Sequence, residues 1–332
     1  MAYSHRTPRK LAHASLGLLA LGLLAAPSAT YAQSFPSKPI RFVVPTGPST
    51  PPDIISRIIA TELSESEKWQ TVVENRGGAM QSLGTAEVIK QDADGYSILA
   101  VGSATTAMPA LMPNLSFKVE TDLTPLIKSA VAYNMLVVGP TVPVKSVAEL
   151  VALIKSQPNK LNFSSGGFGT PPHLLGEMFK LEAGLSVTHV PYNQMAQAIG
   201  DLLNGTNQYQ FIAMPPVVEL VNSGKLRGLA VMGPKRVAAL PDVPSIVEAG
   251  FPKLVGTDWQ GFAVKSGTAN EIVTKLNAAI NKALAKPNVI ATLAKLGAEP
   301  AGGTPAEFAK LMTSQLAHWG NVIRTAGIKV PQ

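Results

Sequence analysis

The chain contains no cysteine among its 332 residues, which excludes disulfide bonds, thiolate nucleophiles and zinc–cysteine sites. Charged residues make up only 15% of it, and no serine-hydrolase, zinc-protease, Walker or complete dinucleotide-binding motif occurs. Beyond residue 32 the histidines are His173, His189 and His318. These absences argue against an enzyme and against a bound cofactor, so we expect neither.

The N-terminus has the pattern of a secretory signal peptide. Three basic residues within residues 6–10 precede an apolar core at residues 16–26, and small residues follow up to Ala32. The apolar core is shorter than the roughly 20 residues that a membrane span needs. We expect residues 1–32 to be removed by cleavage near Ala32 and the remainder to be exported, in a bacterium to the periplasm. A retained N-terminal anchor is the alternative.

The charge balance argues against a nucleic-acid partner. Residues 1–32 hold three basic and no acidic residues, so their removal lowers the formal net charge from +7 to +4. The remaining excess is spread along the chain, without a basic cluster interleaved with aromatic residues. A mild positive balance is compatible with a small anionic ligand.

From Phe35 onward, β-branched runs that resemble strands alternate with segments that resemble helices. This alternation, with a hydrophobic share of 46%, predicts an α/β fold with mixed, mostly parallel sheets and flanking helices. The expected strands include residues 40–44, 97–102, 135–138 and 209–213. The expected helices include residues 52–63, 172–183 and 244–248, and the chain after about Trp259 is expected to be mostly helical.

One arrangement occurs twice: a strand, a loop of Gly, Ser and Pro, then Thr-Pro-Pro and a helix. The two threonines are Thr50 and Thr170. Threonine suits the N-cap, and proline suits the first helical position because its fixed φ matches a helix start. Thr50 and Asp53 also have the spacing of a capping box.

A loop of this kind can bind an anion through backbone N–H groups at a helix N-terminus. Because two prolines remove N–H groups from the first turn of each helix, loop amides and hydroxyls would have to contribute much of the binding. Neither loop contains Lys or Arg. Either loop alone is compatible with an ordinary turn of an α/β fold, but two near copies favour a shared site. The candidates are Gly47, Ser49, Thr50, Ser164, Ser165, Gly167, Phe168, Gly169 and Thr170.

The aromatic and histidine candidates differ in how specific they are. Phe168 lies inside the Gly/Ser loop and is the aromatic residue that we most expect at a ligand, and Tyr192 favours the same reading. Trp259 fits a core and a cleft wall equally well. His173 and Glu177 are four residues apart on one helix face, but no third ligand is near them in the sequence, so we expect no metal site.

Longer segments carry a family resemblance. In order they are PSKPIRFVVP, VVENRGGA, DADGYSILAVGS, KSVAELVALIKSQPNKLNFSSGGFGTPPHL, THVPY, GKLRGLAV, LPDVPSIVEAGFP and KLGAEPAGGTPAEFAKLM. They closely resemble the Bug-type (TctC-like) substrate-binding receptors of tripartite tricarboxylate transporters. The resemblance covers about residues 35–329.

This resemblance implies a two-domain periplasmic binding protein of the flytrap kind. Residues 34–135 plus 257–332 would form domain 1, residues 136–256 would form domain 2, and the ligand cleft would lie between them. The ligand would be a small carboxylate held between the two loops with the help of ordered waters. The protein, a monomer, would deliver it to membrane transporter subunits.

The resemblance also implies which residues face the ligand. The first loop would contribute one wall, the second loop the other, and Ser103, Thr105 and Tyr192 match further ligand-facing stretches. The first wall is Pro45, Thr46, Gly47, Ser49, Thr50 and Asp53. The second wall is Ser164, Ser165, Gly166, Gly167, Phe168, Gly169 and Thr170.

Two departures from the family pattern bear on the ligand. The first loop has Ser49-Thr50 where the family usually has a glycine pair, and the strand ending at Met214 lacks an acidic residue that is common in the family. The missing acid argues against a ligand with a free amine. The stiffer loop, together with Met214 and Phe168, favours a flat aromatic dicarboxylate such as terephthalate.

Three alternatives remain at this stage. The ligand could be an aliphatic di- or tricarboxylate, or the protein could be a sensing receptor that signals to a partner instead of feeding a transporter. The third is a secreted hydrolase that uses Ser164 or Ser165 with His173, although no acidic residue has the spacing to orient that histidine.

Overall fold

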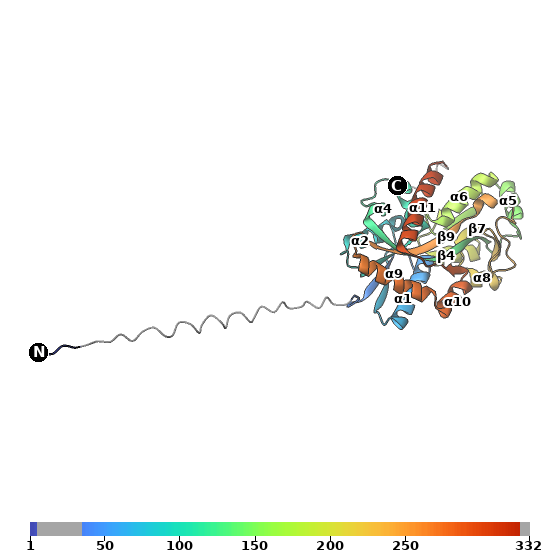
Figure 1. Cartoon of the computed structure of the whole chain (residues 1–332). Helices are drawn as coiled ribbons and strands as arrows, with labels where there is room; N and C mark the ends of the chain where they lie inside the picture. Colours follow the sequence, from blue (N-terminus) through green and yellow to red (C-terminus); the bar gives the residue numbers. More distant parts are fainter. Residues whose placement is uncertain (5–34, 326–332) are drawn as a thin grey trace. The chain divides into compact units, whose positions relative to one another are not determined.

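The structure, a computed structural model, describes residues 1–4 and 35–325 of the chain. The expected signal peptide and its cleavage point near Ala32 lie almost wholly outside the described residues. From Lys38 on, the chain forms one compact unit, in which helices flank a mixed sheet (Figure 1). The division into residues 34–135 plus 257–332 and residues 136–256 therefore stays a prediction.

The sheet has the strand order β2-β1-β3-β9-β4-β7-β5-β6, with β8 and β10 pairing with β4 off this path. Pairing is parallel at its two ends, where β1 joins β2 and β3, and β5 joins β6 and β7. At the centre, β9 and β4 pair antiparallel with their neighbours. The α/β class is confirmed, with more antiparallel pairing than the sequence indicated. The strands are β1 (Ile40–Val44), β2 (Thr71–Asn75), β3 (Ser97–Gly102), β4 (Leu123–Val138), β5 (Asn162–Ser165), β6 (Thr188–Pro191), β7 (Tyr209–Ala213), β8 (Arg227–Val231), β9 (Thr257–Lys265) and β10 (Ala298–Pro300).

The helices lie around this sheet, with α2 and α4 toward one end of it and α5 and α8 toward the other (Figure 1). The mostly helical C-terminal part is confirmed by three helices after β9. The helices are α1 (Pro51–Ser66), α2 (Ser82–Lys90), α3 (Ser103–Leu111), α4 (Val119–Asp122), α5 (Val147–Ser156), α6 (Pro171–Ala183), α7 (Met195–Asn204), α8 (Val218–Asn222), α9 (Asn270–Leu284), α10 (Pro287–Lys295) and α11 (Pro305–Thr325), with short 3₁₀ turns η1 (Ala79–Gln81) and η2 (Pro252–Leu254).

Strand β4 belongs to both halves of the sheet. Residues up to Tyr133 pair with β9, and residues 134–138 pair with β7. The sequence predicted only residues 135–138 as strand, because Pro125 and two register shifts interrupt the alternation of the earlier part. The helix expected at residues 244–248 is wrong: Ser245 and Glu248 exchange hydrogen bonds in a single turn, and Ser245 bridges to β8.

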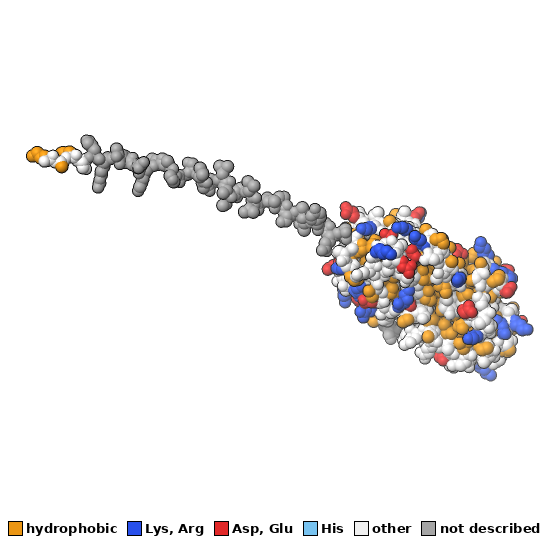
Figure 2. Space-filling view, turned by 90° about the horizontal axis from the view of Figure 1, so that it is seen from below, with side chains coloured by type: hydrophobic (Ala, Val, Ile, Leu, Met, Phe, Trp, Pro, Cys, Tyr) orange, Lys and Arg blue, Asp and Glu red, His pale blue; other side chains and the backbone are white. Residues whose placement is uncertain are grey.

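Within residues 1–4 and 35–325 no helix has both the length and the apolar character that crossing a membrane requires. On the face drawn in Figure 2, Lys and Arg side chains are interspersed with Asp and Glu side chains. That face carries no single-sign patch of the kind that nucleic-acid binding needs.

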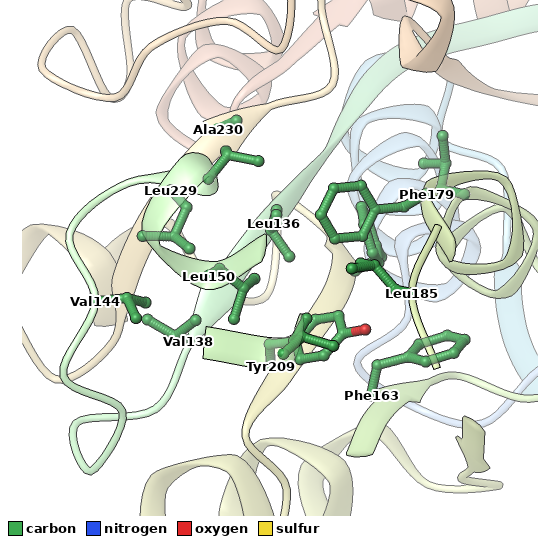
Figure 3. Packing of buried hydrophobic residues seen from close by; sticks show 14 of the residues in the cluster. Leu136, Val138, Val144, Leu150, Phe163, Phe179, Leu185, Tyr209, Leu229 and Ala230 are labelled. Carbon is green, nitrogen blue, oxygen red and sulfur yellow. The ribbon is translucent and has the colours of Figure 1, made fainter. Parts of the chain in front are cut away.

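The core around β7 shows how this part of the sheet is stabilised. Tyr209 lies beside Phe163, with Phe179 of α6 nearby (Figure 3), and the ring of Phe211 packs edge-on to all three. The Phe179 and Phe211 ring centroids lie 5.6 Å apart in an edge-on arrangement. Burying one such side chain contributes about 1.5–3 kcal/mol, so this cluster holds β5, the strand before the second loop, firmly in place.

Two helical glycines provide a matched test of this packing. A Cβ placed on Gly176 in α6 would lie 2.2 Å from Cε2 of Phe163, whereas a Cβ on Gly200 in α7 would meet nothing within 4 Å. We expect Gly176→Ala to lower the free energy of unfolding by about 1–3 kcal/mol through overpacking. We expect Gly200→Ala to raise it by about 0.5–1 kcal/mol through helix propensity. Urea denaturation measures both, and equal effects of the two substitutions would contradict this account.

Candidate functional site

The loops after β1 and β5 each contain the same kind of internal hydrogen bond, from a threonine hydroxyl to a glycine carbonyl. Thr50 Oγ1 donates to the carbonyl oxygen of Gly47 at 2.8 Å, and Thr170 Oγ1 donates to that of Gly167 at 2.7 Å. In both loops the residue before the threonine is left-handed. The repeat seen in the sequence is therefore a repeat in backbone geometry.

The capping box predicted for Thr50 and Asp53 does not form. Thr50 occupies the N-cap position of α1, but its side chain makes no capping hydrogen bond. Pro52 removes one of the two N–H groups from which an N-cap side chain can accept. Ser49 has a φ of 62°, and its N–H donates to the Asp53 carboxylate at 2.9 Å. Gly169 takes the corresponding place in the second loop, with a φ of 75°.

Asp53 is only 3% exposed, and its carboxylate holds the first loop in place by accepting the Ser49 N–H. Its carboxylate also accepts from Asn75 Nδ2 at 3.0 Å and pairs with Arg57 at 2.9 Å. Burial acts to raise the pKa of Asp53, but hydrogen bonds from Arg57, Asn75 and Ser49 together hold this pKa below its ordinary value. Asp53, predicted on the ligand wall, lies in a supporting position.

The second loop rests on two neutral histidines. Ser165 Oγ lies 2.7 Å from His189 Nε2 and accepts the N–H of Gly167 at 3.2 Å, while the N–H of Gly169 donates to His173 Nδ1 at 3.2 Å. Burial lowers the pKa of His173 to about 4 and that of His189 to about 3. Both rings are uncharged at neutral pH, so the loop is held by dipoles and not by ionic pairs.

Phe168 packs on these histidines. Its half-buried ring lies edge-on to His173 at 5.3 Å and to His189 at 5.1 Å between ring centroids. The aromatic side chain that we most expect at a ligand therefore packs in part on the histidines that support its own loop. Its contact with a ligand stays a prediction.

The hydrolase alternative is wrong. Ser165 pairs with His189 and not with the expected His173, and no carboxylate among the described residues orients the ring of His189, whose Nδ1 is buried without a partner. Ser164 Oγ is likewise buried without a partner. Acyl transfer by serine needs a base that is itself oriented by a third group. Among the described residues, no group of three or more His, Asp or Glu side chains is placed to hold a metal ion.

Three predicted aromatic and methionine candidates lie in packed interiors. Tyr192 is 8% exposed and its hydroxyl contacts Asp201 at 2.6 Å. Met214 is fully buried, and Trp259 is buried with its ring edge-on to Phe308 at 5.4 Å. Of the two readings of Trp259, the structure supports the core.

Other predicted residues do come together. A Cβ placed on Gly47 would lie 3.6 Å from the carbonyl oxygen of Asn193, and a Cβ on Gly167 would lie 3.7 Å from that of Tyr192. The segment after β6 therefore lies against both loops. Ser103 and Thr105 begin α3, at the same end of the sheet as the first loop, since β1 and β3 are parallel neighbours.

The sequence analysis did not identify residues 77–81 as part of this region. A Cβ on Gly77 would lie 3.3 Å from the backbone nitrogen of Gly47, and one on Gly169 would lie 2.6 Å from Met80 Cε. The segment thus touches both loops. Its signal in the sequence was the pair Gly77-Gly78 directly before a helix.

Asp258 was also missed as part of this region. It is 5% exposed at the start of β9, where it accepts from Ser103 Oγ and, at 3.0 Å, from Gln260 Nε2. Burial raises the pKa of Asp258 to about 6, against the opposite effect of these two hydrogen bonds.

This fold, with its paired loops, is that of a solute-binding protein. The sequence profile described as tripartite tricarboxylate transporter family receptor matches residues 55–328. Protein BugT of Bordetella pertussis is 34% identical over 90% of this chain and 92% of its own length. The chain therefore belongs to the tripartite tricarboxylate transporter receptor family, whose members are receptors and not enzymes.

Two solved structures show the same fold. The structure described as R. palustris Rpa4515 with adipate has a TM-score of 0.85 and 32% identity, covering 89% of this chain and 99% of that one. MatC (Rpa3494) from Rhodopseudomonas palustris with bound malate has a TM-score of 0.82 and 27% identity, covering 87% of this chain and all of that one.

We predict that Asp258→Asn changes how stability depends on pH. A carboxyl group whose pKa is raised by folding stabilises the fold most below its unfolded pKa, and this contribution is lost as the pH rises through about 6. The free energy of unfolding of the variant, relative to the parent, should therefore rise by about 2 kcal/mol between pH 4 and pH 7. The unpartnered Gln260 Oε1 can accept from the new amide after a side-chain flip.

Chemical denaturation at a series of pH values measures this difference. Asp242→Asn, at an exposed position, is the control and should run parallel to the parent. A parallel curve for Asp258→Asn as well would contradict the raised pKa.

Proposed function

We propose that this receptor captures a small carboxylate between the loops after β1 and β5 in the periplasm and delivers it to the membrane subunits of a tripartite tricarboxylate transporter. The observation that carries the proposal is the duplicated loop: two helix starts with the same threonine–glycine hydrogen bond, both lying against the segment after β6. Helix starts of this kind favour anions.

The side chains of these loops hold the backbone more than they offer donors. The hydroxyl protons of Thr50 and Thr170 are used on glycine carbonyls, and Thr46 Oγ1 lies 2.7 Å from Thr50 Oγ1. The carboxylate would therefore be bound chiefly by loop N–H groups. A micromolar affinity corresponds to about −8 kcal/mol, and hydrogen bonds to a charged group contribute about 1.5–3 kcal/mol each. Because ordering the site costs several kcal/mol, about four or more such bonds must converge.

Domain closure would bring these donors together. If residues 34–135 plus 257–332 and residues 136–256 move as two domains of a monomer, only the closed state lets a ligand touch both loops. The ligand would then favour that state by its differential affinity. The central strands β4 and β9 join the two ends of the sheet and are the natural pivot.

The ligand that we favour is an aromatic dicarboxylate such as terephthalate. The related structures contain adipate and malate, both dicarboxylates, which supports the class. Phe168 adds a half-buried ring to the second loop, and β7 together with Met214 carries no acidic side chain for an amine. An aliphatic di- or tricarboxylate and a sensing role are the alternatives.

The direct test is a thermal-shift screen of residues 33–332, followed by calorimetry. Terephthalate, benzoate, adipate, succinate, malate, citrate and glutamate form the panel. We expect terephthalate to raise the melting temperature by mass action and benzoate, with one carboxylate, to raise it less. A shift with aliphatic acids alone would overturn the aromatic hypothesis. The absence of any shift would overturn the carboxylate proposal.

Loop variants test which hydrogen bonds matter. We expect Ser165→Ala and Thr170→Ala to weaken binding of the best panel ligand about tenfold or more, since each releases Gly167 of the second loop. Ser49→Ala should weaken it less, because the bond from the backbone N–H of Ser49 to Asp53 remains. Equal affinities of the three variants by calorimetry would refute this ranking.

A further inference from the structure

Three consecutive residues of η1 have a backbone conformation that side chains disfavour. Ala79, Met80 and Gln81 have φ values of 42°, 54° and 76°. Elsewhere in residues 1–4 and 35–325, positive φ values at residues other than glycine occur singly, at Ser49, Lys68 and Asn159. Each left-handed residue of this kind costs about 1–2 kcal/mol. Such strain concentrates at ligand clamps and switch regions.

The strained segment lies between the two binding loops. Gly77, just before it, packs against the backbone of Thr46 and Gly47, and Met80 Cε packs against Gly169. Gln81 Oε1 lies 3.3 Å from Thr105 Oγ1. The segment therefore connects the first loop, the second loop and the start of α3.

The strain places two long, uncharged side chains in this position. Met80 is half-buried and packs on a small cluster that includes Leu111 and Leu174. A Cβ on Gly169 would lie 2.7 Å from Leu111 Cδ1, so Met80 and Leu111 together line the second loop with apolar atoms. Methionine is flexible and polarizable, which suits contact with apolar surfaces of varied shape.

Packing alone does not explain this arrangement. Gly77 and Gly78 already give the chain freedom to turn, and glycines at residues 79–81 would adopt the same backbone without strain. Met80 lies at the edge of the cluster of Leu111, Leu174 and Ile323: these members are at most 8% exposed, whereas Met80 is half-buried. What the strained backbone adds is the position of the Met80 and Gln81 side chains.

We propose that Met80 and Gln81 are specificity-determining residues of the ligand site, favouring a carboxylate attached to an apolar body over a compact hydroxylated acid. This inference rests on the proposed function. Met80 would contact the apolar body next to Gly169. Gln81 would set the position of Thr105 without adding a charge that could attract an amine.

The test compares terephthalate, adipate and malate by calorimetry on the parent and on variants. Met80→Gln keeps the side-chain length and the strained backbone but replaces the thioether by a polar amide. We expect it to weaken terephthalate and adipate about tenfold and to change malate less than about threefold. Met80→Leu, which stays apolar, should keep the parent's order of preference and shows whether the position tolerates substitution.

Glycine variants separate strain from side-chain contact. Met80→Gly with Gln81→Gly relieves two left-handed residues and removes both side chains, so the affinity ratio of terephthalate to malate should fall. Lys68→Gly is the matched control: it relieves a φ of 58° at the far end of α1, about 24 Å along the helix from the first loop. It should raise the melting temperature and leave both affinities unchanged.

The outcomes are distinguishable. An unchanged affinity ratio in folded Met80→Gln and in the double glycine variant, with carboxylate binding preserved, would overturn the role of Met80 and Gln81 alone. A parent protein that binds no carboxylate would overturn the proposed function and this inference with it. A ratio that falls in both variants, and stays constant in Lys68→Gly and Met80→Leu, would support it.

Discussion

The hydrogen bond from a threonine hydroxyl to a glycine carbonyl three residues earlier is the constraint on which both Thr-Pro-Pro loops depend. It forms because the helix that follows begins with two prolines, which leave the threonine little to cap. The hydroxyl turns back onto its own loop, and the left-handed residue between them closes the turn. Sequence, local backbone and site geometry are linked by this one interaction. The price is that the threonine no longer serves as a free donor, so recognition passes to backbone N–H groups.

The groups that support the first loop are charged, whereas those that support the second loop are neutral. Under the first loop, Asp53 is ionised and matched by Arg57 and Asn75. Under the second, Ser165, His189 and His173 form a network without net charge, because burial disfavours imidazolium. A carboxylate between the loops therefore faces no nearby ammonium or guanidinium from the loops themselves. Selectivity of the proposed site would then depend on loop geometry and on nearby apolar side chains, of which Phe168 and Met80 are the candidates.

Local patterns in the sequence predicted the parts of this site that depend on neighbouring residues. The Thr-Pro-Pro loops, β1, β3 and β7 all lie where turn chemistry and β-branched runs indicated. What the sequence did not indicate depends on contacts between residues that are not neighbours in the chain. Tyr192 looked free beside a loop, yet Asp201, nine residues on, accepts a hydrogen bond from its hydroxyl at 2.6 Å. The first part of β4 escaped notice because its bulges and Pro125 hide an alternation that pairing with β9 maintains. Residues 77–81 escaped because left-handed backbone at Met80 and Gln81 leaves no trace in residue type.

The titratable groups near the two loops differ in the pH range over which they change charge. His173 and His189, with pKa values of about 4 and 3, are neutral at pH 5 and above. Asp53 is held ionised by its partners, since its pKa is lowered. Asp258 differs, because burial brings its pKa to about 6, beside Ser103 at the start of α3. Of these four groups, Asp258 is therefore the one that changes charge between pH 5 and pH 7, whereas the groups that support the two loops proposed to hold the carboxylate keep their charge state.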